Sequence, residues 1–319
     1  MTRTNANLLM LLAGLLWGGG FIAQQKAMDD IGPFLFIVLR FSIAALAIVP
    51  LAVWEQRKAR ASRPVAELGG NAGAPKAGIV AGMTVVSLCF FATMGAQQVG
   101  LLATTVTNAG MLTGLYVVLV PIICFVFLRQ HQPLIVWPCA AAATLGIWML
   151  GGGSFNALTW GDGFVLIGAI FAALHVIAIG HYAQNTNRPV ALAIAQFAIG
   201  AVLALIAYLI ARVFDWQFEP AANWEIIKAA MPSILYAAIV AGAAAFTLMA
   251  ICQQYTPASD AAVLLSSEAL FAALGGALLL GERLSALGYL GCAILFAAIV
   301  VVSFASAQSE PLTVPDRAN

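Results

Sequence analysis

Apolar residues follow one another in long stretches of this chain, with no Asp, Glu, Lys or Arg among them. The longest stretch covers residues 77–128, and others cover 163–187, 189–211, 229–259 and 284–309. A helix that crosses a bilayer needs about 20 apolar residues, so each stretch can hold at least one crossing. Backbone groups cannot stay unpaired in hydrocarbon, so the spans must be helices or closed barrels. Because the runs are continuous rather than alternating, they predict helices.

We therefore predict an all-α membrane protein with ten transmembrane helices. The expected spans cover residues 8–25, 32–53, 77–99, 104–128, 134–150, 161–183, 189–213, 231–252, 258–280 and 284–305. Two long internal segments, 54–76 and 214–230, are expected outside the hydrocarbon. The second holds Trp216, Phe218 and Trp224 among charged residues, a pattern typical of the membrane interface.

Composition agrees with lipid as the main solvent of the chain. Hydrophobic residues make up 62% and charged residues 8%, with a mean hydropathy of +0.97, whereas soluble domains carry about 25% charged residues. The net charge of +1 favours no nucleic-acid partner. The five cysteines lie in expected spans without metal-type spacing, and no GxxxxGK[ST] motif is present. We expect neither a metal nor a cofactor.

Basic residues predict how the chain lies in the membrane. With the N-terminus inside, the inner segments hold nine Lys and Arg residues and the outer segments hold four. Basic residues concentrate on the cytoplasmic side of membrane proteins. We expect a multi-pass protein of the inner (plasma) membrane with both termini in the cytoplasm. Residues 306–319 are expected to form a disordered tail.

The two halves of the chain resemble each other. A shift of 156 pairs Pro33 with Pro189 and Gln97-Gln98 with Gln253-Gln254, and a shift of 152 then pairs Asn108 with Asp260. The expected organisation is a first repeat in residues 1–150, a linker in 151–160 and a second repeat in 161–305. An odd number of spans in each copy inverts the second copy, and inverted repeats are the architecture of many secondary transporters.

Several segments resemble one known family. The stretch LLAGLLWGGGFIAQQ in the first span, LRF at 39–41, TTVTNAGMLTGLYVVLVP at 104–121 and YTPASDAAVLLSSEALFAALGGALLLGERLS at 255–285 resemble EamA-type members of the drug/metabolite transporter superfamily. The resemblance covers about residues 8 to 305. It implies a ten-helix permease of two inverted five-helix repeats around a central cavity, moving small metabolites and often exporting amino acids.

Two charged residues inside expected spans are candidates for a binding site. Arg40 lies in the second span and Glu268 near the middle of the ninth. A central charge costs about 2.5–3.5 kcal/mol on insertion scales, so each needs a partner or a wet cavity. They are expected to approach each other or to share a cavity, where Arg40 could attract a carboxylate and Glu268 an ammonium. The alternatives are a fixed structural ion pair or an Arg40 that binds helix ends.

The fourth span adds a polar face. Thr104, Asn108, Met111 and Leu115 follow helical spacing, with Tyr116 beside them. Asn108, Met111 and Tyr116 suit an amphipathic ligand, and hydrogen bonding between helices is the equal alternative. Gln97-Gln98 and Gln253-Gln254 could be gates or polar helix ends, and polar ends are the preferred interpretation.

Three further residues complete the candidate site. Ser267, beside Glu268, would meet the fourth span from the second repeat. Trp17 precedes three glycines and could form a wall of a cavity or pack elsewhere. His175, in the middle of the sixth span, could take up protons near neutral pH, although a neutral hydrogen-bonding role is more usual.

These observations favour a secondary transporter that moves small amphipathic metabolites by alternating access, with amino acids as the first candidate substrates and export as the expected direction. Its partners would be the substrate and the lipid bilayer, with proton coupling open and no signal for an oligomer. Export of drugs, nucleotide derivatives or sugar derivatives is the alternative. An intramembrane enzyme would need a convergent catalytic set and a channel a selectivity filter, and the sequence has neither.

Overall fold

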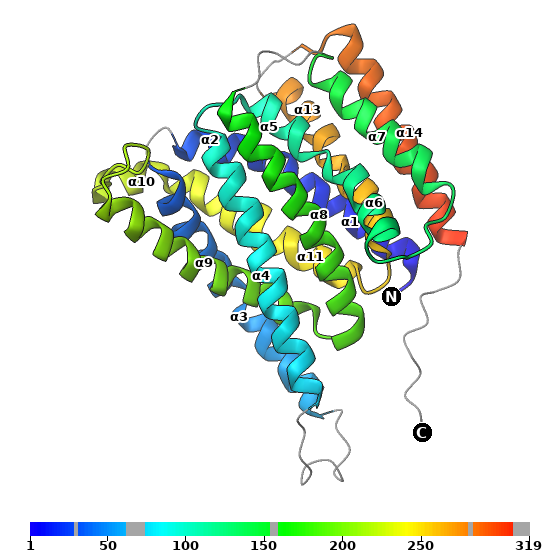
Figure 1. Ribbon diagram of the computed structural model, residues 1–319, viewed down its shortest axis with the longest axis horizontal. Helices are drawn as coiled ribbons and strands as arrows, with labels where there is room; N and C mark the ends of the chain where they lie inside the picture. The colour runs from blue at the N-terminus through cyan, green and yellow to red at the C-terminus, as the bar shows by residue number, and fades with distance from the viewer. Residues whose placement is uncertain (29–30, 62–73, 154–158, 280–282, 309–319) are drawn as a thin grey trace.

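The computed structural model describes residues 1–28, 31–61, 74–153, 159–279 and 283–308, and these residues form helices and short connections without strands (Figure 1). The helices are α1 Arg3–Gly18, α2 Gly20–Met28, α3 Pro33–Ala61, α4 Ala74–Gly100, α5 Val106–Thr113, α6 Tyr116–Val126, α7 Val136–Leu150, α8 Trp160–Thr186, α9 Pro189–Val213, α10 Trp224–Leu235, the π-helix η2 Tyr236–Ala244, α11 Ala245–Cys252, α12 Ala258–Leu265, α13 Ser267–Leu279 and α14 Ala286–Gln308.

Most of the expected spans correspond to helices of the structure. Among the described residues, eight helical segments are long and apolar enough to cross a membrane, and Val136–Leu150 is a shorter apolar helix. The all-helical membrane class is therefore confirmed. The count of ten stays a prediction, because α1 and α2 are short helices separated by Gly19.

Some boundaries differ from those expected. Helix α3 continues to Ala61, so part of the expected loop 54–76 is helical, and α14 continues to Gln308, into the expected tail. Within the linker, Gly152 and Gly153 adopt positive φ, and Thr159 forms a capping box with Asp162 at the start of α8. The rest of the linker (154–158) and of the tail (309–319) lies outside the described residues.

The helical hydrogen bonding of the fourth and ninth expected spans is briefly interrupted in the middle, at residues that keep helical φ and ψ. Helix α5 ends at Thr113 and α6 begins at Tyr116, with Gly114 as the C-cap of α5; α12 ends at Leu265, and Ser266 separates it from α13. The shift of 152 pairs Gly114 with Ser266, so both repeats break at the same position. The prediction of one continuous face from Thr104 to Leu115 is wrong, because Thr104 precedes α5 and Leu115 follows its end.

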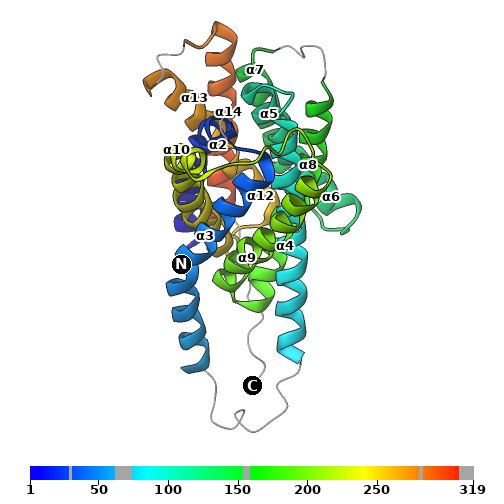
Figure 2. The same ribbon diagram turned by 90° about the vertical axis from the view of Figure 1, so that its left-hand side faces the viewer.

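Helices pair across the two repeats. Helix α3 packs on α9, α4 on α8, α7 on α14, and α1 on α11 and α13 (Figures 1 and 2). The α3–α9 pair is capped reciprocally. Glu55 on α3 accepts hydrogen bonds from the first N–H groups of α9, and Glu219, after α9, accepts those of Phe34 and Leu35 on α3. The two caps connect this pair at both of its ends.

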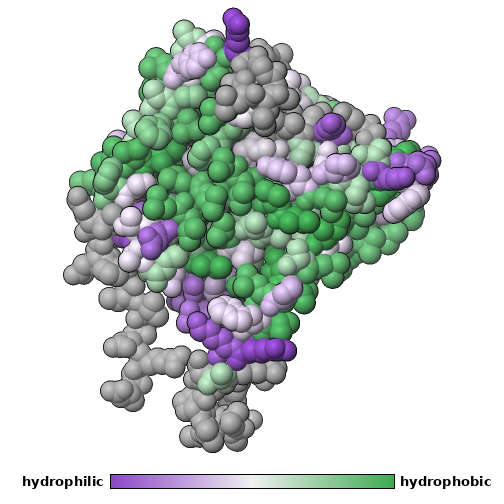
Figure 3. Space-filling model, turned by 180° about the vertical axis from the view of Figure 1, so that it is seen from behind, coloured by the Kyte–Doolittle hydropathy of each residue, from purple (hydrophilic) through white to green (hydrophobic). Residues whose placement is uncertain are grey.

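The outer surface suits a lipid environment. Large apolar side chains are exposed along the helices, for example Leu46, Val202 and Phe296. Figure 3 shows apolar surface across the middle of the molecule and hydrophilic residues mostly toward its edges. Such a surface would be unfavourable in water and is favourable in a bilayer.

Candidate functional site

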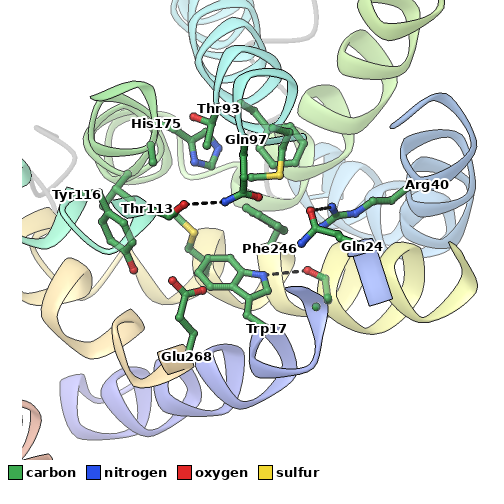
Figure 4. Close-up of a pocket in the computed structure, with 17 residues that line it drawn as sticks. Trp17, Gln24, Arg40, Thr93, Gln97, Thr113, Tyr116, His175, Phe246 and Glu268 are labelled. Atoms are coloured by element: carbon green, nitrogen blue, oxygen red, sulfur yellow. Dashed lines mark hydrogen bonds between the residues drawn. The ribbon is translucent and has the colours of Figure 1, made fainter. Parts of the chain in front are cut away.

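A cavity lies among helices of both repeats (Figure 4). Its lining residues are Trp17, Gly20, Gln24, Arg40, Phe90, Thr93, Met94, Gln97, Thr113, Tyr116, Ala172, His175, Val176, Ala241, Phe246, Met249 and Glu268. The walls are therefore mostly apolar and aromatic, with a few polar groups among them.

Related positions of the two repeats face each other across this cavity. The shift of 156 pairs Phe90 with Phe246 and Thr93 with Met249, and the shift of 152 pairs Tyr116 with Glu268. The rings of Phe90 and Phe246 are in contact, with centroids 4.8 Å apart. The cavity therefore lies on the boundary between the repeats.

Tyr116 and Glu268 follow the two helix breaks. Tyr116 is the first residue of α6, and Glu268 lies in the first turn of α13. The Tyr116 side chain is buried, its hydroxyl has no hydrogen-bond partner, and it lies close enough to Glu268 to interact electrostatically. Within the described part of the chain, neither of the two ion pairs involves Glu268. Tyr116 and Glu268 therefore place a hydroxyl and a carboxyl group at equivalent positions of the two repeats in the cavity.

Arg40 lines the same cavity in different surroundings. It is 3% exposed. Its Nε donates to the carbonyl oxygen of Ala237 and its Nη1 to Oε1 of Gln24, both at 3.1 Å. The guanidinium also lies 5.9 Å from the ring centroids of Phe36 and Phe41. Figure 4 shows Arg40 and Glu268 on opposite sides of the cavity, so the two share it without forming an ion pair.

The π-helix η2 supplies carbonyl groups to this site. A π-helix bonds i to i+5 and often occurs at functional sites. Two carbonyls of η2 accept from cavity side chains, that of Ala237 from Arg40 and that of Ala241 from Nε1 of Trp17 at 2.9 Å. The Trp17 ring packs on Phe246 with centroids 4.6 Å apart. Trp17 is therefore held as part of the cavity wall.

His175 is buried between aromatic rings. Its Nε2 lies 2.8 Å from Oε1 of Gln196, and its ring centroid lies 5.3 Å from that of Phe90 and 6.0 Å from that of Phe246. The shift of 156 pairs Gln196 with Arg40. The imidazole therefore lines the cavity, and the side chain of Gln196 is its polar partner.

Three residues expected at the site lie elsewhere. Asn108 is at the start of α5, where its side chain is within hydrogen-bonding reach of Asp162. Met111 lines a separate apolar hollow between α5, α6 and α7. The buried hydroxyl of Ser267 faces α1 near Gly14.

Sequence reasoning did not assign several cavity residues to the site. Nε2 of Gln97 donates to Oγ1 of Thr113 at 2.9 Å, and Gln24 holds Arg40. Gln97 and Gln98 lie in the last turn of α4 and Gln253 caps the end of α11, so they are helix ends as expected, and all three are buried. Their partners come from other elements of the chain, so spacing along the sequence does not identify them.

Polar contacts join the repeats at two ends of the bundle. The α1–α12 contact consists of Arg3 Nη2 to Asp260 Oδ2 at 2.8 Å and Thr256 Oγ1 to Asn7 Oδ1 at 3.1 Å. The α5–α8 contact consists of Thr104 Oγ1 to Asp162 Oδ1 at 2.5 Å. The shift of 152 pairs Thr104 with Thr256, so the two threonines occupy equivalent positions in inverted repeats.

Fold and cavity together define a helical membrane protein of two related halves with a shared central cavity. The EamA-like transporter family model matches residues 4–152 and 159–304, so the chain belongs to that family. It is similar to an uncharacterized transporter of Archaeoglobus fulgidus, 31% identical over 94% of this chain and 86% of that one. It is also similar to the uncharacterized transporter YwfM of Bacillus subtilis, 27% identical over 95% of both chains. A protein of known crystal structure shares the fold, with a TM-score of 0.70 and 17% identity over 96% of this chain and 98% of that one.

Proposed function

We propose that this protein is a secondary transporter that moves small amphipathic metabolites through the central cavity by alternating access. The observation that carries the proposal is the pairing of equivalent positions across the cavity, Phe90 with Phe246 and Tyr116 with Glu268. Two inverted halves can exchange conformations around such a site, which then opens first to one side and then to the other.

The two end contacts support the same mechanism. Thr104 and Thr256 are equivalent by the repeat, and each bonds a polar residue near the start of the other repeat's first helix. Exchange of conformations between the repeats would weaken one contact while the other stays formed. Each contact then closes the cavity toward one side of the membrane.

Amino acids are the first substrate class that we propose, with export as the direction. The cavity walls combine aromatic and thioether groups with a carboxylate, which suits a small molecule with one apolar and one charged part. Drugs, nucleotide derivatives and sugar derivatives are the alternative class. Coupling to protons is part of the proposal to be tested, with Glu268 and His175 as the titratable groups of the cavity.

We also propose the plasma membrane as the location and the cytoplasm as the side of both termini. The excess of nine basic residues over four on the expected inner segments supports this orientation. Figure 1 shows the start of α1 and the end of α14 at the same end of the bundle, as an even number of crossings requires.

Counterflow in proteoliposomes tests the proposal. Vesicles loaded with one unlabelled amino acid are given the same compound in labelled form, with and without a pH gradient. A carrier gives transient, saturable accumulation without any gradient, and a further rise with the gradient indicates proton coupling. Linear, non-saturable flux would instead indicate a channel. If amino acids give no counterflow, the same assay with drugs, nucleotide derivatives and sugar derivatives decides the substrate class.

A further inference from the structure

The carboxylate of Glu268 projects into the cavity. None of the hydrogen bonds or ion pairs formed among the described residues involves its oxygen atoms, and Figure 4 shows it pointing into the cavity. An unpaired carboxylate in such a site is costly. Either a proton or the positive charge of a ligand has to compensate it.

A second unpartnered group lies beside this carboxylate. The hydroxyl of Tyr116 is buried and makes no hydrogen bond to any residue that the structure describes, although buried hydroxyls normally find a partner. An ammonium group has three N–H donors and could bond both the Glu268 carboxylate and the Tyr116 oxygen. The two groups therefore form an incomplete site that matches a primary ammonium.

The aromatic walls fit the same kind of ligand. Trp17 and Phe246 line the cavity in contact with each other. Rings of this kind attract cations through their faces, with tryptophan the strongest. They also offer apolar surface to the body of the ligand, as Met94 and Met249 do.

Arg40 is less available than Glu268 to bind a ligand. Its guanidinium already donates to Ala237 and Gln24 and lies 5.9 Å from the ring centroids of Phe36 and Phe41. It also lies on the opposite side of the cavity from Glu268 (Figure 4). The ammonium and carboxylate of an α-amino acid are carried by one carbon atom, so a ligand held at Glu268 keeps its carboxylate away from Arg40.

We propose that the cavity recognises its substrate through an ammonium group bound by Glu268 and Tyr116, and that a carboxylate on the substrate is not required. This inference rests on the proposed transport function and narrows its substrate class to amphipathic organic amines. Amino acids bind through their amino group, and the corresponding amines without the carboxylate bind at least as tightly.

Four ligands of similar shape test the inference on the full-length purified protein. They are phenethylamine (cation), phenylalanine (zwitterion), 2-phenylethanol (neutral) and 3-phenylpropionate (anion), and binding is measured by calorimetry and by ligand-dependent thermal stabilisation. We expect phenethylamine to bind at least as tightly as phenylalanine. We expect 2-phenylethanol and 3-phenylpropionate to bind about 30-fold more weakly or worse, as is usual when a buried charge loses its partner.

Substitutions test whether Glu268 and Tyr116 form the ammonium site. Glu268→Gln is expected to weaken phenethylamine binding about 30-fold while leaving 2-phenylethanol binding unchanged, and Tyr116→Phe to weaken phenethylamine binding about fivefold, the loss expected for one hydrogen bond. The matched controls are Glu225→Gln and Tyr289→Phe, whose side chains are exposed outside the cavity. The ligand series on the unaltered protein keeps the test valid if a variant does not fold.

The outcomes separate this inference from the proposed function. Lack of phenethylamine binding, equal binding of 3-phenylpropionate, or phenylalanine binding about tenfold tighter than phenethylamine would each overturn the ammonium site. If another class of compound then shows saturable counterflow, the transporter proposal stands without it. If phenethylamine binds as expected but no tested compound, phenethylamine included, gives counterflow, the ammonium site stands and the transport proposal fails.

Discussion

Two charged side chains line one cavity, and their surroundings give them different roles. Arg40 is held by the Ala237 carbonyl, the Gln24 amide and two aromatic rings, whereas Glu268 forms no hydrogen bond or ion pair with another described residue. A group whose hydrogen bonds are made within the protein contributes mainly to structure. A group without partners is available for a ligand.

Arg40→Gln is therefore expected to lower the stability of the protein. The substitution shortens the side chain and leaves the Ala237 carbonyl and the Gln24 oxygen without their donor, at a cost of about 2–4 kcal/mol. Thermal unfolding in detergent measures the effect, with Arg57→Gln, an exposed position on the same helix, as the control. Equal unfolding temperatures for the two variants would contradict the structural role of Arg40.

At the level of elements, glycine allows α1 to pack directly on α13. A Cβ on Gly18 would lie 2.9 Å from backbone atoms of Phe271 and Ala272, and one on Gly14 would lie 3.2 Å from the backbone nitrogen of Glu268. Both helices carry cavity residues, Trp17 on one and Glu268 on the other. The distance between the helices therefore determines the position of those side chains.

Gly18→Ala is expected to destabilise the protein and weaken ligand binding. The added methyl group meets backbone that cannot rotate away, and such overpacking typically costs about 1–3 kcal/mol. Gly163→Ala is the matched control, since a Cβ there meets nothing within 4 Å and alanine favours the helix. Thermal unfolding of both variants measures the difference. The close approach would be of no consequence if Gly18→Ala were as stable as Gly163→Ala.

The Glu219 cap gives a pH-dependent prediction. Burial raises the pKa of the Glu219 carboxyl above 4.5, although the N–H groups of Phe34 and Leu35 and the charge of Arg212 oppose the shift. A carboxyl with a higher pKa in the folded chain contributes stability that is fully present below 4.5 and declines as the pH rises through the folded-state pKa. Loss of a capping carboxylate costs about 1 kcal/mol.

Glu219→Ala should therefore unfold at a lower temperature than the unaltered protein, and the deficit should be larger in acid than at neutral pH. Unfolding temperatures measured across this pH range test both statements. Glu225→Ala, which removes an exposed carboxylate, is expected to show neither effect. A deficit that grows toward neutral pH would contradict the direction of the pKa shift.

The sequence predicted elements better than it predicted contacts. Hydropathy alone located α3, α4, α8 and α9, because a lipid-facing helix must be apolar along its whole length. It could not locate the breaks at Gly114 and Ser266, since glycine and serine also occur inside continuous membrane helices. The repeat pairs Gly114 with Ser266, so it links the two positions at which the helices are interrupted. Only the structure shows that the helices are interrupted there.

The same limit applies to the candidate residues. Glu268, Arg40 and His175 were identified because ionisable groups are rare inside spans, and all three line the cavity. Asn108 and Met111 were grouped with Tyr116 by helical spacing, which holds only within one continuous helix. Gln24 and Gln97 were missed because an amide near a helix end is ordinary in a sequence, and its partner comes from another helix.

For the whole molecule, alternating access requires each end contact to open in turn. The α1–α12 contact and the α5–α8 contact are both formed in this structure, through Thr256 with Asn7 and Thr104 with Asp162. All four side chains are short, so cysteines at these positions are candidates for reversible disulfides. The five native cysteines are free and are first replaced by serine or alanine.

We expect the pair Asn7→Cys with Thr256→Cys to stop counterflow when oxidised, and the pair Thr104→Cys with Asp162→Cys to do the same. Either disulfide holds one side closed, and a carrier that cannot open one side cannot exchange its substrate across the membrane. Reduction should restore counterflow in both cases, and the four single-cysteine variants should be insensitive to oxidant. If only one pair stops counterflow, the other contact does not close a side of the cavity. Unchanged counterflow with both disulfides fully formed would mean that the substrate takes a route that neither contact controls, and alternation between the two repeats would have to be abandoned as the mechanism.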